Sequence, residues 1–365
     1  MNALWSPGIS ELKPYIPGEQ PKVEGLLKLN SNEHPYGPSP KAQAAMVAAV
    51  GDPLRLYPDA SATALRQAVA KQYGIQADQV FIGNGSDEVL AHAFYAFFRR
   101  PGPLLLPDIS YSFYPVYCGL YGITVKRIAL DEHFLINPSH YMGEASLGAT
   151  GIIFPNPNAP TGQALSRAQI KTIVQANPHC VVIVDEAYVD FGAETAAPLI
   201  NEFPNLLVVH TLSKSRAFAG MRVGYAMGQS GLIDALVRVK DSFNSYPLDH
   251  LAQVGAVAAI EDQAYFDWAT QQVVQAREQL TQHLKTLGFE VLPSKTNFVF
   301  ARHHTIKGAE LTEKLRAHRI LIRNFNLPRI SEFVRITVGT FDECKRLINC
   351  IALILEVDSP QNNLN

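Results

Sequence analysis

The sequence predicts an α/β protein, with a large domain whose mostly parallel central sheet is sandwiched by helices and a smaller α+β domain after it. Two observations predict this class. Between about residues 63 and 228, short β-rich apolar runs alternate with helical patterns, as in layered α/β domains. Most of these runs lack polar alternation, as expected of strands that helices cover on both faces. The length of 365 residues also exceeds one ordinary core and favours two domains.

The strands expected in the large domain are short apolar runs, and a helix ending near Phe98 follows the first of them. Their alternation with helices favours one largely parallel sheet. The expected strands are Val80–Ile82, Leu104–Leu106, Thr124–Ile128, Gly151–Phe154, Val181–Asp185, Leu206–His210 and Arg222–Ala226.

The smaller domain is expected after a long helical stretch from about Tyr265 to Leu287. A strand, a helix, two strands and a helix follow, in this order: Asn297–Ala301, Glu310–His318, Ile320–Arg323, Phe333–Val338 and Asp342–Leu355. We therefore expect a large domain at 41–260 and a small domain at 261–365. The Pro- and Gly-rich segment 1–40 is expected to be an extended arm that packs with the small domain.

Composition argues against several classes of partner. Apolar residues make up 47% of the chain and charged residues 18%, which describes a globular protein. The formal net charge is −2 and no basic stripe is present, so nucleic acids and anionic membranes are poor candidate partners. Residues 1–10 lack the pattern of a signal peptide, and the longest apolar runs are too short to span a bilayer.

Cysteine usage gives no sign of a metal site. None of the four cysteines lies in a CxxC pair or near a His at metal-ligand spacing: Cys118, Cys180, Cys344 and Cys350. We expect buried, reduced thiols, no metal and, by elimination, a cytoplasmic protein.

Residues suited to chemistry follow four of the expected strands, at the carboxyl ends where open α/β sheets bind ligands. The first group is Gly83–Glu88, with the sequence GNGSDE. Its glycines permit a tight turn, and free N–H groups at the start of the next helix offer an anion site. Ser86 and Asp87 also suit a helix N-cap, which taken alone is the better explanation.

The second group contains Asp185, which closes the apolar strand Val181–Asp185. A buried, unpaired carboxylate is costly, so this one needs a cationic partner such as a protonated pyridine nitrogen. Helix capping and metal binding are the alternatives, and no His or Asp cluster surrounds it to hold a metal.

The third group contains Lys214, which follows Asp185 by about the length of one helix-and-strand unit. An ordinary lysine has a pKa of about 10.4 and is a poor nucleophile at neutral pH. Partial burial beside Arg216 and Arg222 would lower that pKa, the usual route to a Schiff-base lysine. A solvated lysine in a polar loop is the alternative.

The fourth group is 156–162, with the sequence NPNAPTG. Two prolines and a glycine predict a rigid, sharply turned loop in which one X–Pro bond is a candidate for cis. Each group has an ordinary structural explanation, yet all four lie at strand ends of one domain. A phosphate cradle, a buried acid and a lysine with adjacent cations together indicate a phosphorylated aldehyde cofactor, pyridoxal 5′-phosphate (PLP).

With these motifs the chain resembles the fold-type-I PLP aminotransferases, and within them the histidinol-phosphate branch, nearly end to end. The most specific segments are 213–222 (SKSRAFAGMR) and 185–188 (DEAY), and the branch is favoured by 29–33 (LNSNE), 35–38 (PYGP) and 57–59 (YPD). The resemblance implies a ping-pong histidinol-phosphate:2-oxoglutarate aminotransferase of histidine biosynthesis.

The resemblance implies catalytic roles for three residues. Lys214 would bind the cofactor as an aldimine and then move the proton between Cα of the substrate and C4′ of the cofactor. Asp185 would hold the ring nitrogen protonated. Tyr188 would hydrogen-bond the phenolic oxygen of the ring.

Further cofactor contacts are implied in the same way. Tyr111 would stack on the ring, although a core aromatic is the alternative reading. The phosphate would be held by Ser86, Asp87, Ser213 and Arg222. Tyr57 would reach the phosphate in the partner subunit, which implies a homodimer with sites at the subunit interface.

One departure from the family concerns the residue before Pro-Thr-Gly, which is usually an Asn that binds the phenolic oxygen. This chain has Ala159 there and Asn158 one place earlier. Either Asn158 reaches the ring through a shifted loop, or Tyr188 holds that oxygen without it.

The implied substrate contacts come from the arm and the small domain. Arg335 resembles the arginine that grips the acidic end of the ligand, with a surface arginine as the alternative. Tyr15 and Arg323 would contact a substrate phosphate, and Asn32 is a further expected substrate contact.

Rival functions share most of these residues. An aromatic amino acid aminotransferase would use the same pocket, and a PLP-dependent decarboxylase of a phosphorylated amino acid would need no amino acceptor. A PLP-fold binding or regulatory module is a third rival, against which the intact Lys214, Asp185 and Arg222 count.

Overall fold

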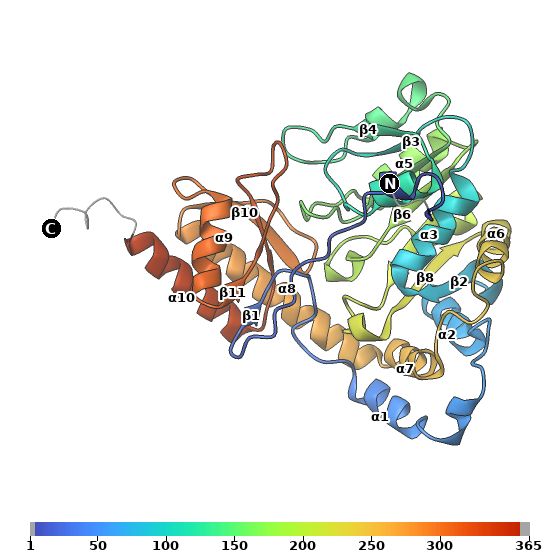
Figure 1. The fold of residues 1–365 in the computed structure, drawn as a ribbon, viewed down its shortest axis with the longest axis horizontal. Helices are drawn as coiled ribbons and strands as arrows, with labels where there is room; N and C mark the ends of the chain where they lie inside the picture. Colours follow the sequence, from blue (N-terminus) through green and yellow to red (C-terminus); the bar gives the residue numbers. More distant parts are fainter. Residues whose placement is uncertain (1–3, 358–365) are drawn as a thin grey trace.

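The computed structural model describes residues 4–357, and the strands in this range form three sheets (Figure 1). The largest has seven strands in the order β2-β8-β7-β6-β5-β3-β4. They are β2 (Val80–Asn84), β3 (Leu104–Pro107), β4 (Val125–Ile128), β5 (Gly151–Pro155), β6 (Val181–Asp185), β7 (Leu206–Thr211) and β8 (Val223–Gly228). All neighbours pair in parallel except β8, which is antiparallel to both β7 and β2. The mostly parallel sheet expected from the sequence is therefore confirmed.

Successive side chains of each buried strand point to opposite faces of this sheet. In β5, Ile152 and Phe154 join one apolar cluster, whereas Ile153 joins another. The first cluster includes residues of α1 (Pro40–Ala48), α2 (Thr63–Tyr73), α5 (Arg167–Ala176) and α7 (His250–Glu261). The second includes residues of α3 (Gly85–Phe97), α4 (Tyr114–Tyr121) and α6 (Ser230–Asp241). Because helices cover both faces, the inner strands such as β5 and β6 are almost entirely apolar, whereas the edge strand β4 carries exposed Lys126 and Arg127.

A four-stranded antiparallel sheet organises the C-terminal part, in the order β12-β13-β10-β9 (Figure 1). Its strands are β9 (Phe289–Val291), β10 (Phe298–His303), β12 (Arg323–Asn324) and β13 (Val334–Thr337). The long helix α8 (Gln263–Thr286) leads into it, and α9 (Gly308–Ala317) and α10 (Phe341–Val357) accompany it.

The segment expected as one strand at 320–323 is divided in the structure. Its first part, β11 (Ile320–Leu321), pairs in parallel with β1 (Leu27–Lys28), whereas β12 pairs with β13. The chain changes sheet at Ile322, and the exchange brings the N-terminal arm against the smaller unit. Leu27 and Leu29 are buried in the same apolar cluster as α8 and β10.

We propose that the domain boundary lies near residue 260, between α7 and α8. The support is that α7 packs into the cluster of the large sheet, whereas α8 packs into that of the smaller sheet. Asp262 lies between the two helices and accepts hydrogen bonds from Ser39 and Lys41 at the start of α1. The two segments that connect the sheets are therefore joined to each other.

Among the described residues, no helix combines the length and the hydropathy needed to cross a membrane. Cys118, Cys180 and Cys344 are buried free thiols, and Cys350 is half-buried. Burial raises the pKa of the Cys180 thiol to about 11, so it stays protonated near neutral pH.

Candidate active site

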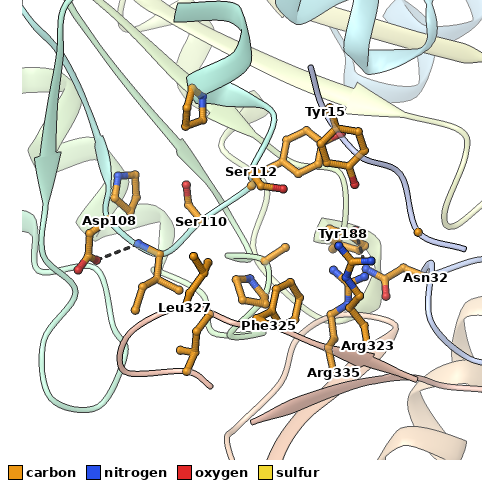
Figure 2. Close-up of a pocket in the computed structure, with 18 of the residues that line it drawn as sticks. Tyr15, Asn32, Asp108, Ser110, Ser112, Tyr188, Arg323, Phe325, Leu327 and Arg335 are labelled. Atoms are coloured by element: carbon orange, nitrogen blue, oxygen red, sulfur yellow. Dashed lines mark hydrogen bonds between the residues drawn. The ribbon is translucent and has the colours of Figure 1, made fainter. Parts of the chain in front are cut away.

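Two adjoining cavities lie beyond the carboxyl ends of the parallel strands, as expected for an open α/β sheet. The larger has a volume of about 380 Å³ and the smaller about 100 Å³. Both are lined by Tyr111, Ala159, Tyr188 and Lys214, so these four residues mark their junction. Figure 2 shows that residues of the arm, of the loop after β3 and of the segment around β12 and β13 line the larger cavity, together with Tyr188 from the segment after β6.

The structure brings together most of the residues expected to bind a cofactor. Those that line the smaller cavity are Ser86, Asp87, Tyr111, Asp185, Tyr188, Ser213, Lys214 and Arg222. Thr211, at the end of β7, lines it as well.

The turn between β2 and α3 is so tightly packed that two neighbouring positions, Gly85 and Gly224, have no room for a side chain. Gly85 has a φ of +78°, and a Cβ there would lie 2.5 Å from the Nη2 atom of Arg222. A Cβ on Gly224 would lie 2.3 Å from the backbone nitrogen of Ser86. Glycine is therefore required at both places, and the space beside the first N–H groups of α3 belongs to the Arg222 guanidinium. This arrangement suits an anion such as a phosphate.

Arg222 does not begin β8, as the sequence suggested, because it adopts a left-handed conformation with φ +54°. Only a few per cent of non-glycine residues have a positive φ, and such positions are frequent at functional sites. The turn lets the Arg222 Nη2 atom donate a hydrogen bond of 3.0 Å to Asp87.

Asp185 is 4% exposed and lines the smaller cavity. Its Oδ2 atom accepts a hydrogen bond of 2.7 Å from the Tyr114 hydroxyl, and Oδ1 accepts one of 3.2 Å from the Ala187 N–H. Burial raises the pKa of Asp185 to about 6, against the lowering effect of these two donors. No ion pair joins Asp185 to a cation within residues 4–357, so a protonated ring nitrogen fits the need for a counter-ion.

Lys214 reaches the junction of the cavities from the loop after β7. Its Nζ atom donates a hydrogen bond of 3.4 Å to the carbonyl of Ser31 and lies 5.9 Å from the Tyr188 ring centroid. The expected neighbour Arg216 is elsewhere. It lines neither cavity, donates to the Ala259 carbonyl and stacks on Phe266 at 3.7 Å. The expectation that Arg216 flanks the lysine amine is therefore wrong.

Two arginines of the larger cavity, Arg323 and Arg335, lie side by side next to Asn32 and Tyr188 (Figure 2). Arg335 is half-buried and donates to the Asn30 carbonyl at 3.0 Å, but its Nε atom has no partner within the described residues. Desolvation lowers the pKa of Arg335, and the nearby Arg323 adds to this effect. No ion pair joins either arginine to a carboxylate among residues 4–357, so the pair is free to bind an anionic ligand.

The remaining expected contacts lie around this pair. Tyr15 lines the larger cavity, with its ring centroid 6.5 Å from that of Tyr111. The Tyr111 hydroxyl donates to Asp87 at 3.0 Å. Asn32 is buried and donates a hydrogen bond of 2.8 Å to the Tyr188 hydroxyl.

Two expected cofactor contacts lie outside both linings. Tyr57 is 81% exposed and stacks on Tyr246, with 4.7 Å between the ring centroids. Asn158 is buried, and its amide donates to the Ile109 carbonyl at 3.0 Å and to the Thr161 hydroxyl at 3.1 Å. Because Ala159 takes the place in the lining, this arrangement counts against Asn158 as a cofactor contact.

The loop that carries Ala159 has cis peptide bonds at Asn156–Pro157 and Ala159–Pro160. The sequence had indicated one such bond in this loop.

Sequence reasoning missed several residues of the site. Tyr114, the hydrogen-bond partner of Asp185, was not among the residues predicted for the site. The apolar wall of the larger cavity includes Phe325, Leu327 and Ile330. The aromatic-rich segment 111–114 (YSFY) gives some indication of Tyr114. Nothing in the sequence indicates that Phe325, Leu327 and Ile330 line the cavity.

Known proteins resemble this chain over almost its whole length. The family model for aminotransferase class I and II matches residues 24–351. "Histidinol-phosphate aminotransferase 1" of Bordetella parapertussis is 58% identical, covering 97% of this chain and 99% of that protein. The "Histidinol-phosphate aminotransferase" of Aromatoleum aromaticum is 56% identical, covering 97% and 100%.

A solved structure shares the fold. The histidinol-phosphate aminotransferase of Sinorhizobium meliloti, in complex with pyridoxal-5′-phosphate, has a TM-score of 0.81 at 23% identity and covers 90% of this chain and 91% of that one.

Proposed function

This chain belongs to the class I and II aminotransferase family, and on that premise we propose that it is a PLP-dependent histidinol-phosphate aminotransferase of histidine biosynthesis. The observation that carries the proposal is the junction of the two cavities. Lys214 lies between a cradle that suits a cofactor phosphate and a pair of free arginines that suits an anionic substrate.

The residues around the smaller cavity fit the cofactor. Arg222, Ser213 and the first N–H groups of α3 would hold its phosphate. Asp185 would pair with the protonated ring nitrogen, and Tyr188 would donate to the phenolic oxygen. When bound, PLP supplies the electron sink that stabilises the negative charge left at Cα of the substrate.

The chain's own groups would then perform the proton transfer. Lys214 would bind the cofactor covalently and, once the substrate amine has displaced it, take the proton from Cα and deliver it to C4′. The Asp185 carboxylate would keep the ring nitrogen protonated. The protonated nitrogen would in turn be the cationic partner that this buried carboxylate needs. A ping-pong reaction follows, because donor and acceptor use one site in turn.

The larger cavity suits both substrates. Arginine binds carboxylate and phosphate alike through bidentate hydrogen bonds, so Arg335 and Arg323 can hold glutamate or a phosphorylated substrate. Phe325, Leu327 and Ile330 offer apolar surface for a ring. The volume of about 380 Å³ falls within the range of small-ligand sites.

We further propose a cytoplasmic homodimer whose sites lie at the subunit interface. The exposed Tyr57 supports this assembly, since it lines neither cavity of its own subunit's site and its exposed ring can reach the cofactor site of another. The free thiols support a reducing compartment.

The test is a half-reaction followed by absorbance. PLP-loaded protein is mixed with histidinol phosphate without an amino acceptor, and we expect the band of the covalently bound cofactor to give way to that of pyridoxamine phosphate. Phenylalanine and a phosphorylated amino acid are the comparison substrates. A response to phenylalanine alone would keep the transamination and refute the substrate, and CO₂ release from the phosphorylated amino acid would indicate a decarboxylase.

A further inference from the structure

Both the backbone and the side chain of Asn32 are hydrogen-bonded, and its amide nitrogen points to Tyr188. It is 1% exposed, and its Nδ2 atom donates to the Tyr188 hydroxyl at 2.8 Å. The Thr337 hydroxyl, at the end of β13, accepts from the Asn32 backbone N–H at 3.0 Å and donates to Oδ1 at 3.2 Å. The Asn297 amide, directly before β10, donates to the Asn32 carbonyl at 2.9 Å.

These bonds determine which way each proton points. A hydroxyl has one proton, and that of Thr337 is directed to Oδ1 of Asn32. The NH₂ side of the Asn32 amide therefore faces Tyr188, whose oxygen is an acceptor. The single proton of the Tyr188 hydroxyl has no other acceptor among the described residues, and Tyr188 lines both cavities.

We propose that Asn32 is a positioning residue that directs the Tyr188 proton into the cavity, where it is donated to the phenolic oxygen of the cofactor. This inference rests on the proposed function. A bond received by the Tyr188 oxygen polarises its O–H, since hydrogen bonds in a chain strengthen one another. Through Thr337 and Asn297, the smaller sheet thereby sets the strength of a bond to the cofactor that sits on the large sheet.

Other charges around Tyr188 act on the same oxygen and must stay constant in a test. Lys214 lies 5.9 Å from the ring centroid, Arg335 interacts with Tyr188 electrostatically, and Asp185 and Asp87 line the smaller cavity with it. The informative variants therefore carry no charge.

The experiment is a pH titration of the visible absorbance of the PLP-loaded dimeric protein. Donation from Tyr188 stabilises negative charge on the phenolic oxygen, which lowers the affinity of the bound cofactor for its proton. Asn32→Gly keeps a residue that tolerates the φ of +56° at this position and removes the amide. We expect the titration midpoint of Asn32→Gly to rise by roughly 0.2–0.6 of a pH unit. Tyr188→Phe should raise the midpoint further, because it removes the donated hydrogen bond completely.

A matched pair at Thr337 separates this effect from folding. Thr337→Val preserves the shape but loses the hydroxyl, and we expect a rise in the midpoint. Thr337→Ser restores the hydroxyl, and we expect the midpoint of the unchanged protein. If Asn32→Gly does not fold, the comparison of the titration midpoints of Thr337→Val and Thr337→Ser tests the proposal by itself.

The idea is overturned if Asn32→Gly and Thr337→Val titrate like the unchanged protein, or if Tyr188→Phe does so. A different failure belongs to the proposed function: the unchanged protein would then show no visible band with PLP at all.

Discussion

The Tyr114 hydroxyl donates a hydrogen bond of 2.7 Å to Oδ2 of Asp185, between the start of α4 and the end of β6. The bond supports a carboxylate that has no cation beside it in the described chain. Burial nevertheless raises the pKa of Asp185 to about 6, so the cofactor-free protein carries an unfavourable charge above that pH. The carboxylate that the proposed chemistry requires therefore lowers the stability of the cofactor-free protein.

Asp185→Asn should therefore stabilise the cofactor-free protein near pH 7. The unfolded chain loses the Asp185 proton near pH 3.8 and the folded chain near pH 6, so stability falls as the pH rises through this window. We expect the variant to gain up to about 3 kcal/mol in the free energy of unfolding at pH 7 and almost nothing at pH 4. Urea denaturation at both pH values measures this. Asp234→Asn on the surface of α6 is the control, and an equal gain at pH 4 would contradict the explanation.

Lys214→Ala should remove covalent cofactor binding and nearly all turnover while the fold remains. No other side chain at the junction of the cavities is a primary amine, so none can replace it. Borohydride reduction followed by intact-mass measurement should show the cofactor adduct in the unchanged protein and none in the variant. The control Lys171→Ala, which loses an ion pair with Glu202 outside both cavity linings, should keep the adduct. Retained turnover in Lys214→Ala would refute the mechanism.

Arg335→Lys should lower kcat/KM by about 10- to 100-fold. Lysine keeps the charge but loses the forked geometry, and a hydrogen bond to a charged group contributes about 1.5–3 kcal/mol. Steady-state kinetics with glutamate and with histidinol phosphate measure the loss, which should affect both substrates. An effect on only one of them would mean that Arg335 does not serve both half-reactions.

Arg329→Ala should raise KM several-fold with little change in cofactor binding. Arg329 donates to Asp108 at 3.2 Å, to the Leu130 carbonyl at 3.1 Å and to the Asp131 carbonyl at 2.6 Å. These bonds fasten the loop that carries Leu327 and Ile330 across the larger cavity. Arg302→Ala, which breaks an ion pair with Glu290 outside both cavities, should leave KM unchanged. A fall in PLP affinity with unchanged KM would contradict the role of the loop.

Mixed dimers test whether Tyr57 acts across the interface. A dimer of one Lys214→Ala subunit and one Tyr57→Phe subunit has one intact site if Tyr57 serves its partner, and none if it serves its own subunit. We expect half of the wild-type activity with wild-type PLP affinity. Weak PLP binding at the remaining site would show that Tyr57 acts within its own chain.

The sheet could be predicted because most of its strands are buried on both faces and are therefore runs of apolar residues. Asp185 and Lys214 could be found because they lie at or shortly after the carboxyl ends of β6 and β7, which the sheet brings together. Arg222 lies directly before β8, at the end of the segment that contains Lys214. These inferences depend only on chain order and burial.

Side-chain directions could not be predicted in the same way. Arg216 follows Lys214 by two residues but turns to Ala259 and Phe266. Asn158 and Ala159 are neighbours, yet only Ala159 lines the cavities. The contact between Asn32 and Tyr188 joins residues far apart in sequence and depends on how the arm pairs with β11, which no local pattern reports.

The hydrogen bonds of Asp262 to Ser39 and Lys41 affect how the two sheets can move relative to each other. The chain passes from the smaller sheet to the large one before α1 and returns between α7 and α8, and Asp262 binds Ser39 and Lys41 where these passages meet. Because these two passages are hydrogen-bonded to each other, we expect any movement of the smaller sheet against the large one to be mainly a rotation about this point. Such a rotation would carry Arg323 and Arg335 together, toward or away from Lys214, so that substrate capture and access to the lysine become one movement.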